Sequence, residues 1–421
     1  MLIEFSVENY RSIGARQTLS MVASADKTLL DNNSFPISHT SKPRLLTSAV
    51  IYGPNASGKS NLVRAMRVVR NLVVESATRM QVGDRFDIQP FRLDANFHKQ
   101  PSHFEIHFIQ NGIRYEYGLI LTQTRVLQEW LFAYPKGRAQ NWFVRNYNLA
   151  AQADSWIFSS QLKGQKERIK TFVRPNSLFL SHAAQNNHPQ LSEVFEWFRD
   201  KLNIFDNFSS MEGLTTDFCK EDEQFQQDVI SFLSVADVGI SGLKIESESL
   251  DDRKLPTEAY SEKLKTMIQL EYEVIRVKTL HKMKDSEDLI PFDLGEESDG
   301  TQRLFEIAGF WLITLEYGEI LVMDELDRSL HPTLTTHLIK LFNDRTINKN
   351  NAQLIFTTHD TVFLDKNIFR RDQVWFTEKD KSSATKLYSL QDFKPIKDES
   401  LQKGYLQGRY GAIPFIGKLN I

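Results

Sequence analysis

Cysteine is almost absent from this sequence, since Cys219 is the only one among 421 residues. A single cysteine excludes an internal disulfide and a cysteine-based zinc cluster. It is also typical of proteins from a reducing compartment, so we expect a cytoplasmic protein.

Long apolar runs are absent as well. No stretch approaches the ~20 apolar residues that a membrane-spanning helix needs. The opening residues, MLIEFSVENYRSIG, lack both the basic start and the continuous apolar core of a signal peptide. We therefore expect no membrane partner.

An excess of charge of one sign is also missing. The formal net charge is −3, which does not indicate a general binder of nucleic acid or of anionic membranes. One local exception is the segment 163–174 (KGQKERIKTFVR), which has five Lys or Arg and one Glu. This segment fits either a solvated helix face or a patch that contacts phosphates.

The sequence does have the composition of a globular protein, with 41% hydrophobic and 25% charged residues. Its length predicts one large domain with an insertion, or two domains. Short apolar or alternating segments predict strands at 2–7, 48–52, 319–323 and 353–357. Two alternating segments between 85 and 133, joined at Asn111-Gly112, predict an antiparallel hairpin.

The remaining segments show other patterns. Helical periodicity follows Ser60 and recurs at 160–233 and 331–342. The polar segment 24–47 predicts a loop, and residues 236–290 predict short strands with a charged linker. Strand, helix and strand in the last third predict a parallel crossover.

A complete phosphate-binding motif lies between a predicted buried strand and a predicted helix. The residues GPNASGKS at 53–60 match G-x-x-x-x-G-K-[ST], in which backbone N–H groups surround phosphate oxygens at a helix amino end. Lys59 is expected to reach the β and γ phosphates, and Ser60 to ligate Mg²⁺. The expected nucleotide contacts are Gly53, Asn55, Ala56, Ser57, Gly58, Lys59, Ser60 and Asn61.

A second motif, ILVMDE at 320–325, is an apolar strand that ends in two carboxylates. Open α/β sheets bind ligands at the carboxyl ends of their strands. We expect Asp324 to hold Mg²⁺ through its coordination shell and Glu325 to polarise the attacking water as a general base. Taken alone, an apolar strand followed by two acidic residues is more often only a strand end. The phosphate motif upstream makes a functional site the favoured interpretation.

Two further segments fit the same chemistry. Ser298-Asp299-Gly300-Thr301 opens an apolar periodic helix and offers a hydroxyl and backbone donors to an anion, although by itself it is a helix cap. His359 ends the apolar strand 354–358 and can hydrogen-bond a phosphate or the attacking water.

The order of these four segments resembles the ATP-binding-cassette (ABC) ATPases, specifically the SMC-like and OLD-like branch that includes the recombination mediator RecF. There SDGT at 298–301 looks like the signature motif, LDRSLHP at 326–332 like the D-loop, and His359 like the switch histidine. SDGT replaces the transporter form SGGQ, and His331 stands where transporters usually have Asp. Both departures argue against a transporter more than against hydrolysis.

The resemblance implies a homodimer that sandwiches two ATP molecules with Mg²⁺. In such a dimer Ser298 and Gly300 of each chain touch the γ-phosphate held by the other chain. It also implies two further nucleotide contacts, Arg11 in the opening FSVENYRSI segment and Gln89 as the glutamine loop, with Gln89 also a Mg²⁺ ligand.

The motifs ENYRSI, GPNASGKSN, ESDGTQRL and DELDRSLHP, with the tail YLQGRYGAIPFI, are similar to the abortive-infection ATPases of prokaryotic phage-defence loci, the AbiL, RloA and AriA type. This similarity implies an α/β fold, an ABC-ATPase head with a P-loop core and an antiparallel β subdomain. Residues 1–150 are expected to form one lobe of the head, 151–290 a mainly helical insertion with short strands, and 291–421 the other lobe.

Our first functional hypothesis is an ATP-hydrolysing switch that dimerises around nucleotide and controls a separate effector, a toxin or nuclease, in anti-phage defence. Only 62 residues follow His359, too few for the Toprim nuclease domain of OLD-type proteins, so we expect any cleavage chemistry in another polypeptide. The alternative is a RecF-like or SMC-like DNA-binding clamp that contacts DNA through the 163–174 segment. A third hypothesis is a scaffold that binds ATP without turnover.

Overall fold

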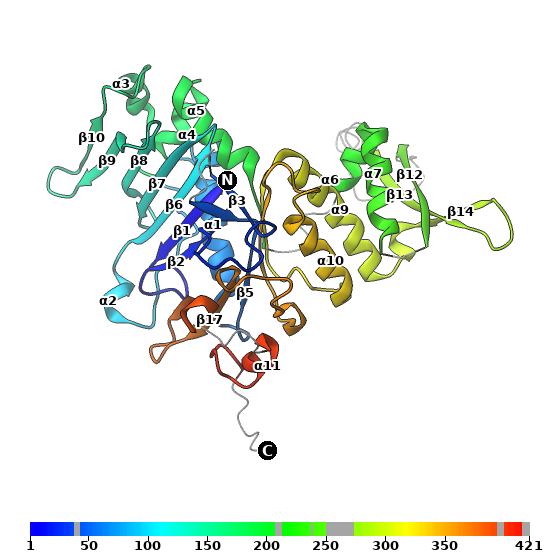
Figure 1. The fold of residues 1–421 in the computed structure, drawn as a ribbon. Coiled ribbons are helices and arrows are strands. Elements are labelled where there is room, and N and C mark those ends of the chain that lie inside the picture. Colours follow the sequence, from blue (N-terminus) through cyan, green and yellow to red (C-terminus); the bar gives the residue numbers. More distant parts are fainter. Residues whose placement is uncertain (38–42, 207–212, 237–238, 250–272, 394–399, 415–421) are drawn as a thin grey trace, which may run out of the picture. The chain divides into compact units, whose positions relative to one another are not determined.

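The computed structural model describes residues 1–37, 43–206, 213–236, 239–249, 273–393 and 400–414. The chain forms two compact units (Figure 1). Unit 1 comprises Met1–Asn207, Thr314–Arg328 and Thr335–Ile421, and unit 2 comprises Phe208–Ile313 and Ser329–Leu334.

A six-stranded sheet forms the core of unit 1, in the order β11-β15-β16-β5-β17-β18. Its strands are β5 (Ser48–Tyr52), β11 (Leu202–Phe205), β15 (Ile320–Met323), β16 (Gln353–Thr357), β17 (Val374–Lys379) and β18 (Thr385–Ser389). The first five strands in this order run parallel, and β18 pairs antiparallel with β17. Every residue of β5, β15 and β16 is buried, as expected for strands covered on both faces. The predicted core strands and parallel crossover are confirmed.

A seven-stranded antiparallel sheet forms the second layer of unit 1, in the order β10-β9-β8-β7-β6-β1-β2. Its strands are β1 (Leu2–Glu8), β2 (Gln17–Ser20), β6 (Ser102–Gln110), β7 (Ile113–Leu121), β8 (Val126–Tyr134), β9 (Gln140–Asn148) and β10 (Ala153–Phe158). β6 and β7 pair in register around Asn111 and Gly112, whose φ angles of 49° and 75° suit a tight hairpin turn. The predicted hairpin is confirmed.

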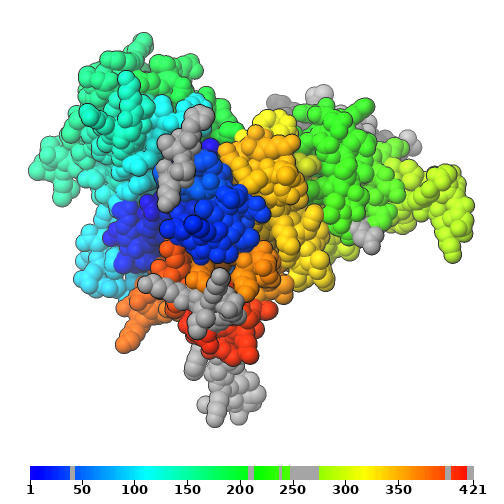
Figure 2. Space-filling model, viewed as in Figure 1, coloured from blue at the N-terminus to red at the C-terminus, as the bar shows by residue number. Residues whose placement is uncertain are grey.

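Helix α1 (Lys59–Glu75) contributes buried apolar residues to one hydrophobic core that includes side chains from both sheets. In Figure 2, the amino-terminal part of the chain (dark blue) and its carboxyl-terminal part (orange to red) lie next to each other on the surface of unit 1. The other helices of unit 1 are α2 (Ala95–His98), α3 (Lys166–Ile169), α4 (Phe179–Gln185), α5 (Pro189–Glu196), α11 (Leu401–Leu406) and, from Thr335 onward, α10 (Pro332–Asn343). Unit 1 also has the short turns η1 (Lys170–Phe172), η2 (Trp197–Lys201), η5 (Thr361–Phe363), η6 (Arg371–Gln373) and η7 (Leu390–Phe393).

Unit 2 combines helices with a small antiparallel sheet of order β12-β13-β14. Its elements are α6 (Leu214–Glu221), α7 (Glu223–Ser234), β12 (Ile240–Ser249), β13 (Glu273–Lys282), β14 (Leu289–Asp293), η4 (Leu294–Glu296) and the first part of α9 (Asp299–Tyr317). The Thr215 hydroxyl donates to the Glu306 carbonyl at 2.8 Å and ties α6 to α9. A Cβ at Gly309 would lie 2.5 Å from Thr215 Oγ1, so the two helices meet through a residue without a side chain.

The structure divides the chain differently from the predicted ranges 1–150, 151–290 and 291–421. Residues 151–206 belong to unit 1 because β10 completes the antiparallel sheet and β11 pairs with β15 in the core sheet. The predicted loop at 24–47 is wrong in part, since β3 (Ser34–Pro36) pairs with β4 (Arg44–Leu46). Among the described residues, no helix is long and apolar enough to span a membrane.

Candidate nucleotide site

The loop at 53–58 joins the buried strand β5 to the amino end of α1, as the motif predicts. Gly53 and Gly58 have φ angles of 155° and 113°. A Cβ at Gly53 would lie 2.4 Å from the Thr377 carbonyl oxygen, and one at Gly58 would lie 2.1 Å from Thr385 Oγ1. Because backbone and hydroxyl groups occupy that space, both positions require glycine.

Hydroxyl groups far away in the sequence hold this loop. Ser57 Oγ and Thr377 Oγ1 are 2.7 Å apart, and Thr385 Oγ1 donates to the Ser57 carbonyl at 2.7 Å. Ser12 Oγ lies 2.8 Å from the same Thr385 Oγ1 and accepts from Asn61 Nδ2 at 2.7 Å. Sequence reasoning missed these threonines and Ser12, because only the pairing of distant strands brings them to the loop.

Lys59 is buried at the start of α1 and turns back onto the loop. Its ammonium donates to the carbonyls of Gly53 at 2.7 Å and Pro54 at 3.2 Å. Burial lowers the pKa of Lys59 to about 8, while the charges of Asp324, Glu325 and Asp327 oppose that shift. The carboxylates therefore act electrostatically on the lysine of the loop.

The two predicted carboxylates follow β15, next to the end of the parallel strand β16. Thr357, the last residue of β16, links them: its Oγ1 donates to Asp324 Oδ1 at 2.6 Å and accepts from the Glu325 N–H at 2.8 Å. Glu325 has a φ angle of 52°, a left-handed conformation that is costly for a non-glycine residue. Such strain is typical of functional sites, and the sequence contained no signal for Thr357.

His359 lies just beyond β16, with its side chain partly exposed. Burial of the ring and the charge of Lys59 lower the pKa of His359, and Asp327, Glu325 and Asp324 oppose that shift. The imidazole is therefore neutral at pH 7 and can both donate and accept a hydrogen bond.

One cavity of about 270 Å³ brings most of the predicted site residues together. It is lined by Asn55, Ala56, Ser57, Gly58, Lys59, Ser60, Asn61, Arg64, Glu325 and His359. Arg64 was not predicted, and it forms an ion pair with Asp206, 3.6 Å from Nε to Oδ2.

A second cavity of about 320 Å³ shares Asn61 with the first and is lined by Arg11, Gln89 and Arg92, among others. The Arg11 N–H donates to the Gln89 carbonyl at 2.6 Å, which joins the two predicted residues through their backbones. The Arg11 guanidinium donates to Tyr10 Oη and to Asp87, and Gln89 Oε1 accepts from Arg92 at 3.0 Å. Arg11 and Gln89 are thus together, but they line the neighbouring cavity rather than that of the phosphate loop.

Ser298 and Gly300 belong to unit 2, at the amino end of α9. Ser298 Oγ accepts from the Thr301 N–H at 3.2 Å, so this serine caps the helix as the sequence predicts. A Cβ at Gly300 would lie 2.9 Å from the Ser329 carbonyl oxygen, so a side chain there meets the D-loop backbone.

The residues of the unit 1 cavity fit a magnesium nucleotide. Ser60 lines the cavity and Asp324 precedes Glu325 at the end of β15, and both offer the oxygen ligands that Mg²⁺ prefers. The amino end of α1 and the Lys59 ammonium supply the N–H groups and the positive charge that phosphate oxygens need.

A P-loop at the carboxyl edge of a parallel sheet, with two carboxylates on a neighbouring strand, defines the α/β class of P-loop nucleotide-binding proteins. Residues 48–365 match the family described as "AAA domain, putative AbiEii toxin, Type IV TA system". The chain belongs to this family, and the resemblance to abortive-infection ATPases is confirmed.

A search of curated proteins finds no match. The chain is 13% identical to the SMC head domain from Thermotoga maritima, with 92% of this chain and 98% of that chain covered and a TM-score of 0.40. It is 12% identical to the SmcHead bound to the C-winged helix domain of ScpA, with 96% and 99% covered and a TM-score of 0.41.

Proposed function

We propose that this protein is a molecular switch that binds and hydrolyses ATP, dimerises around the nucleotide and controls a separate effector in anti-phage defence. The observation that carries the hydrolytic part is the cavity lined by the phosphate loop, Glu325 and His359 together. A plain anion site at a helix amino end needs neither a strained glutamate nor a neutral histidine.

In this proposal each site residue of unit 1 has a separate role. The loop N–H groups and Lys59 hold phosphate oxygens, once the Lys59 ammonium leaves the carbonyls of Gly53 and Pro54. Ser60 and Asp324 hold Mg²⁺, which supplies positive charge to the phosphates when it is bound. Glu325 takes the proton of the attacking water, and neutral His359 hydrogen-bonds that water or the phosphate.

The dimer and the effector are finer parts of the proposal. The resemblance to ABC ATPases supports a second chain that offers Ser298 and Gly300 to the nucleotide. The family description names a toxin and a type IV toxin–antitoxin system, which supports a role in a defence module with a toxic component. The effector in this proposal is a toxin or a nuclease on another polypeptide.

The first experiment measures ATP turnover and the ATP-dependent mass of the protein, for the native chain and for Glu325→Gln. We expect turnover to fall at least about 100-fold in the variant, because a positioned general base contributes roughly 10²–10⁴-fold. The dimer should persist in ATP. The matched control is Glu287→Gln, which changes a 93% exposed carboxylate and should leave both readouts unchanged.

Two results would overturn parts of the proposal. Absence of turnover in the native chain, with ATP still bound, would favour the scaffold that binds ATP without hydrolysis. A monomer of unchanged mass in ATP would remove the sandwiched dimer. Effector control is tested separately, by asking whether products of neighbouring genes bind the native chain and Glu325→Gln differently in ATP.

The DNA-clamp alternative depends on the basic segment 163–174. Most of the cations in this segment form hydrogen bonds or ion pairs with other groups of the same chain. Arg174 donates to the carbonyls of Ser76, Ala77 and Met80. Lys166 donates to two backbone carbonyls, and Lys170 pairs with a neighbouring glutamate. These contacts favour a structural role, and salt-dependent DNA binding that is lost on Lys163→Ala with Arg168→Ala would restore the alternative.

A further inference from the structure

The outer face of the seven-stranded sheet carries a cluster of histidines and carboxylates that has no part in the nucleotide site. His103, Glu105 and His107 alternate along β6 and share this face, because side chains two residues apart on a strand point the same way. Glu116 lies opposite His107 on β7, and Glu4 lies opposite it on β1. Three strands therefore contribute to one cluster.

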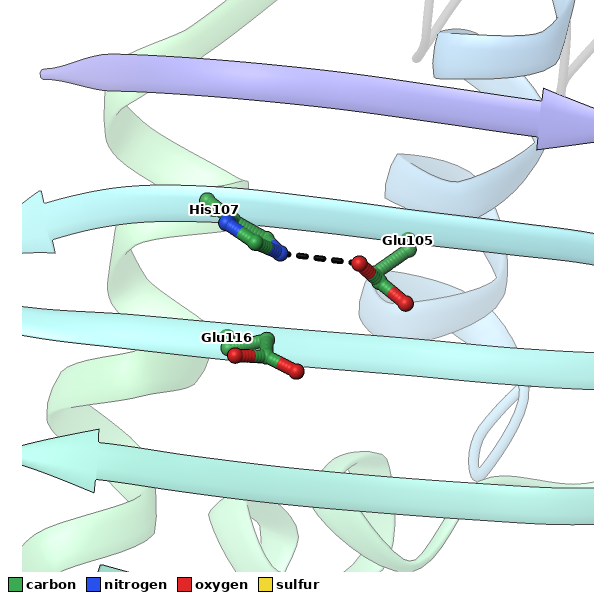
Figure 3. Close-up of side chains that lie close together, drawn as sticks. All are labelled: Glu105, His107 and Glu116. Carbon is green, nitrogen blue, oxygen red and sulfur yellow. Dashed lines mark hydrogen bonds and ion pairs between the residues drawn. The ribbon is translucent and has the colours of Figure 1, made fainter. Parts of the chain in front are cut away.

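Three of these residues come close enough to share an ion. His107 Nε2 is 2.9 Å from Glu105 Oε1, and ligand atoms of Glu105, His107 and Glu116 all lie within 4.8 Å of one another (Figure 3). Ligand atoms around a tetrahedral zinc ion with bonds of 2.0–2.2 Å are spaced about 3.4 Å apart. Small rotations of side chains would bring the three atoms to that spacing.

The second nitrogen of each histidine also has a carboxylate beside it. His107 Nδ1 is 3.8 Å from Glu4 Oε2, and His103 Nδ1 is 3.9 Å from Glu8 Oε2. A metal-bound histidine usually donates its other N–H to a carboxylate, which orients the ring. A hydrogen bond between His107 and Glu105 alone would not require a carboxylate beside the second nitrogen of each histidine.

His103 adds a further contact to the cluster. Its Nε2 atom is buried and has no hydrogen-bond partner in the described residues, and it lies 3.7 Å from Glu105 Oε2. The Trp130 ring packs edge-on against His103, with centroids 5.5 Å apart, and fills the space beside Gly118. This aromatic cover holds the His103 ring with its Nε2 atom beside the Glu105 carboxylate.

From this arrangement we propose that Glu105, His107 and Glu116 bind a divalent transition-metal ion of the zinc type. One imidazole nitrogen with carboxylate oxygens suits Zn²⁺ better than Mg²⁺ or Ca²⁺, which take oxygen ligands. Three protein ligands leave a position for water. Glu4 and His103 are positioning residues that contact the ligands His107 and Glu105.

Arg16 competes with the ion, since its guanidinium donates to Glu105 Oε1 at 2.9 Å. A cation at this distance both occupies a lone pair and repels a second positive charge. Removing this guanidinium should therefore strengthen metal binding. We expect the Arg16→Gln variant to bind Zn²⁺ several-fold more tightly than the native chain does.

The experiment titrates Zn²⁺ into the full-length protein in excess Mg²⁺ without nucleotide, so that oxygen-only sites are occupied. The native chain should bind one equivalent, His107→Gln and Glu116→Gln should bind at least about tenfold more weakly, and Glu4→Gln should lose roughly 10-fold. His98→Gln, at an exposed histidine outside the cluster, is the matched control and should bind like the native chain. Circular dichroism and melting curves show that each variant is folded.

Three outcomes would overturn the proposal: no Zn²⁺ binding by the native chain, equal binding by His107→Gln, or displacement of the bound ion by millimolar Mg²⁺. A Co²⁺-loaded sample gives a second readout, because its visible absorption should change between the native chain and Glu116→Gln. ATP turnover at saturating Mg²⁺ should be the same in native and His107→Gln proteins. The result therefore does not depend on the proposed ATPase activity.

Discussion

The two sheets of unit 1 place polar side chains in opposite ways. The core sheet buries both faces, so its central strands are almost wholly apolar. Its candidate site residues lie at or beyond the strand ends, as Thr357, Glu325 and His359 do. The antiparallel sheet buries one face, so β6 alternates buried Phe104, Ile106 and Phe108 with polar residues on the other face. A doubly covered sheet therefore builds a site at its edge, whereas a singly covered sheet can build one across its surface.

The largest expected effect concerns burial. Ile355, in the centre of β16, is fully buried, and Ile355→Ala should destabilise the protein by about 2–5 kcal/mol through lost burial and a cavity. Ile120, on the outer face of β7, is only half-buried, and Ile120→Ala should cost less than about 1.5 kcal/mol. Denaturant unfolding of both variants measures this difference, and equal losses would break the comparison between the sheets.

The next effect tests how a strand end positions the site. Thr357→Val keeps the shape of the side chain but removes the hydroxyl that contacts Asp324 and the Glu325 N–H. Hydrogen bonds to charged groups contribute about 1.5–3 kcal/mol, so ATP turnover should fall roughly 10–100-fold while ATP binding changes little. Thr357→Ser should restore turnover. An equal loss in Thr357→Ser would show that packing of the methyl group, and not the hydroxyl, matters.

The third effect is gradual and is the smallest when it is counted per pH unit. It tests whether water is excluded from the side chains beneath the antiparallel sheet, as it is from the core sheet. His182 of α4 is buried and bonded to Ser177 Oγ at 2.9 Å. Burial, together with the charges of Arg174 and Arg145, lowers its pKa to about 4. Below pH 6.5 the His182 imidazole binds a proton in the unfolded chain, whereas in the folded chain it stays neutral until the pH approaches 4. Stability should therefore fall as the pH drops from 6.5 toward 4, by at most about 1.4 kcal/mol per pH unit.

The measurement is the free energy of unfolding at several pH values for the native chain and His182→Gln. The variant should lose part of the slope between pH 6.5 and 4, and the two proteins should show parallel curves above pH 6.5. His98→Gln, at an exposed position, should keep the full slope. Parallel curves for native and His182→Gln proteins across the whole range would show that water reaches this side of the sheet.

Local patterns were sufficient for the elements that bear motifs. The strand 48–52, the helix after it, the strand before Asp324 and the hairpin at Asn111-Gly112 all form as predicted, because each depends on neighbouring residues in the sequence. The segment 24–47 and β11 were not predicted as strands. β3 and β4 pair with each other, but each has only three residues, too few to show a periodicity. β11 pairs with β15, a strand far along the chain, and no pattern within a short segment reports such pairing.

The sequence by itself determined the phosphate loop, the order of the motifs and the residue types that can hold a magnesium nucleotide, since glycine, lysine and carboxylate positions are local properties of the chain. Only the tertiary structure decided that Thr357 links Asp324 to Glu325, that Thr377 and Thr385 leave no room beside the loop glycines, and that the paired strands β6 and β7 assemble the Glu105, His107 and Glu116 cluster. The physical reason is strand register: which side chains meet across a sheet depends on pairing between distant segments, and a shift of one residue would turn each of them to the other face.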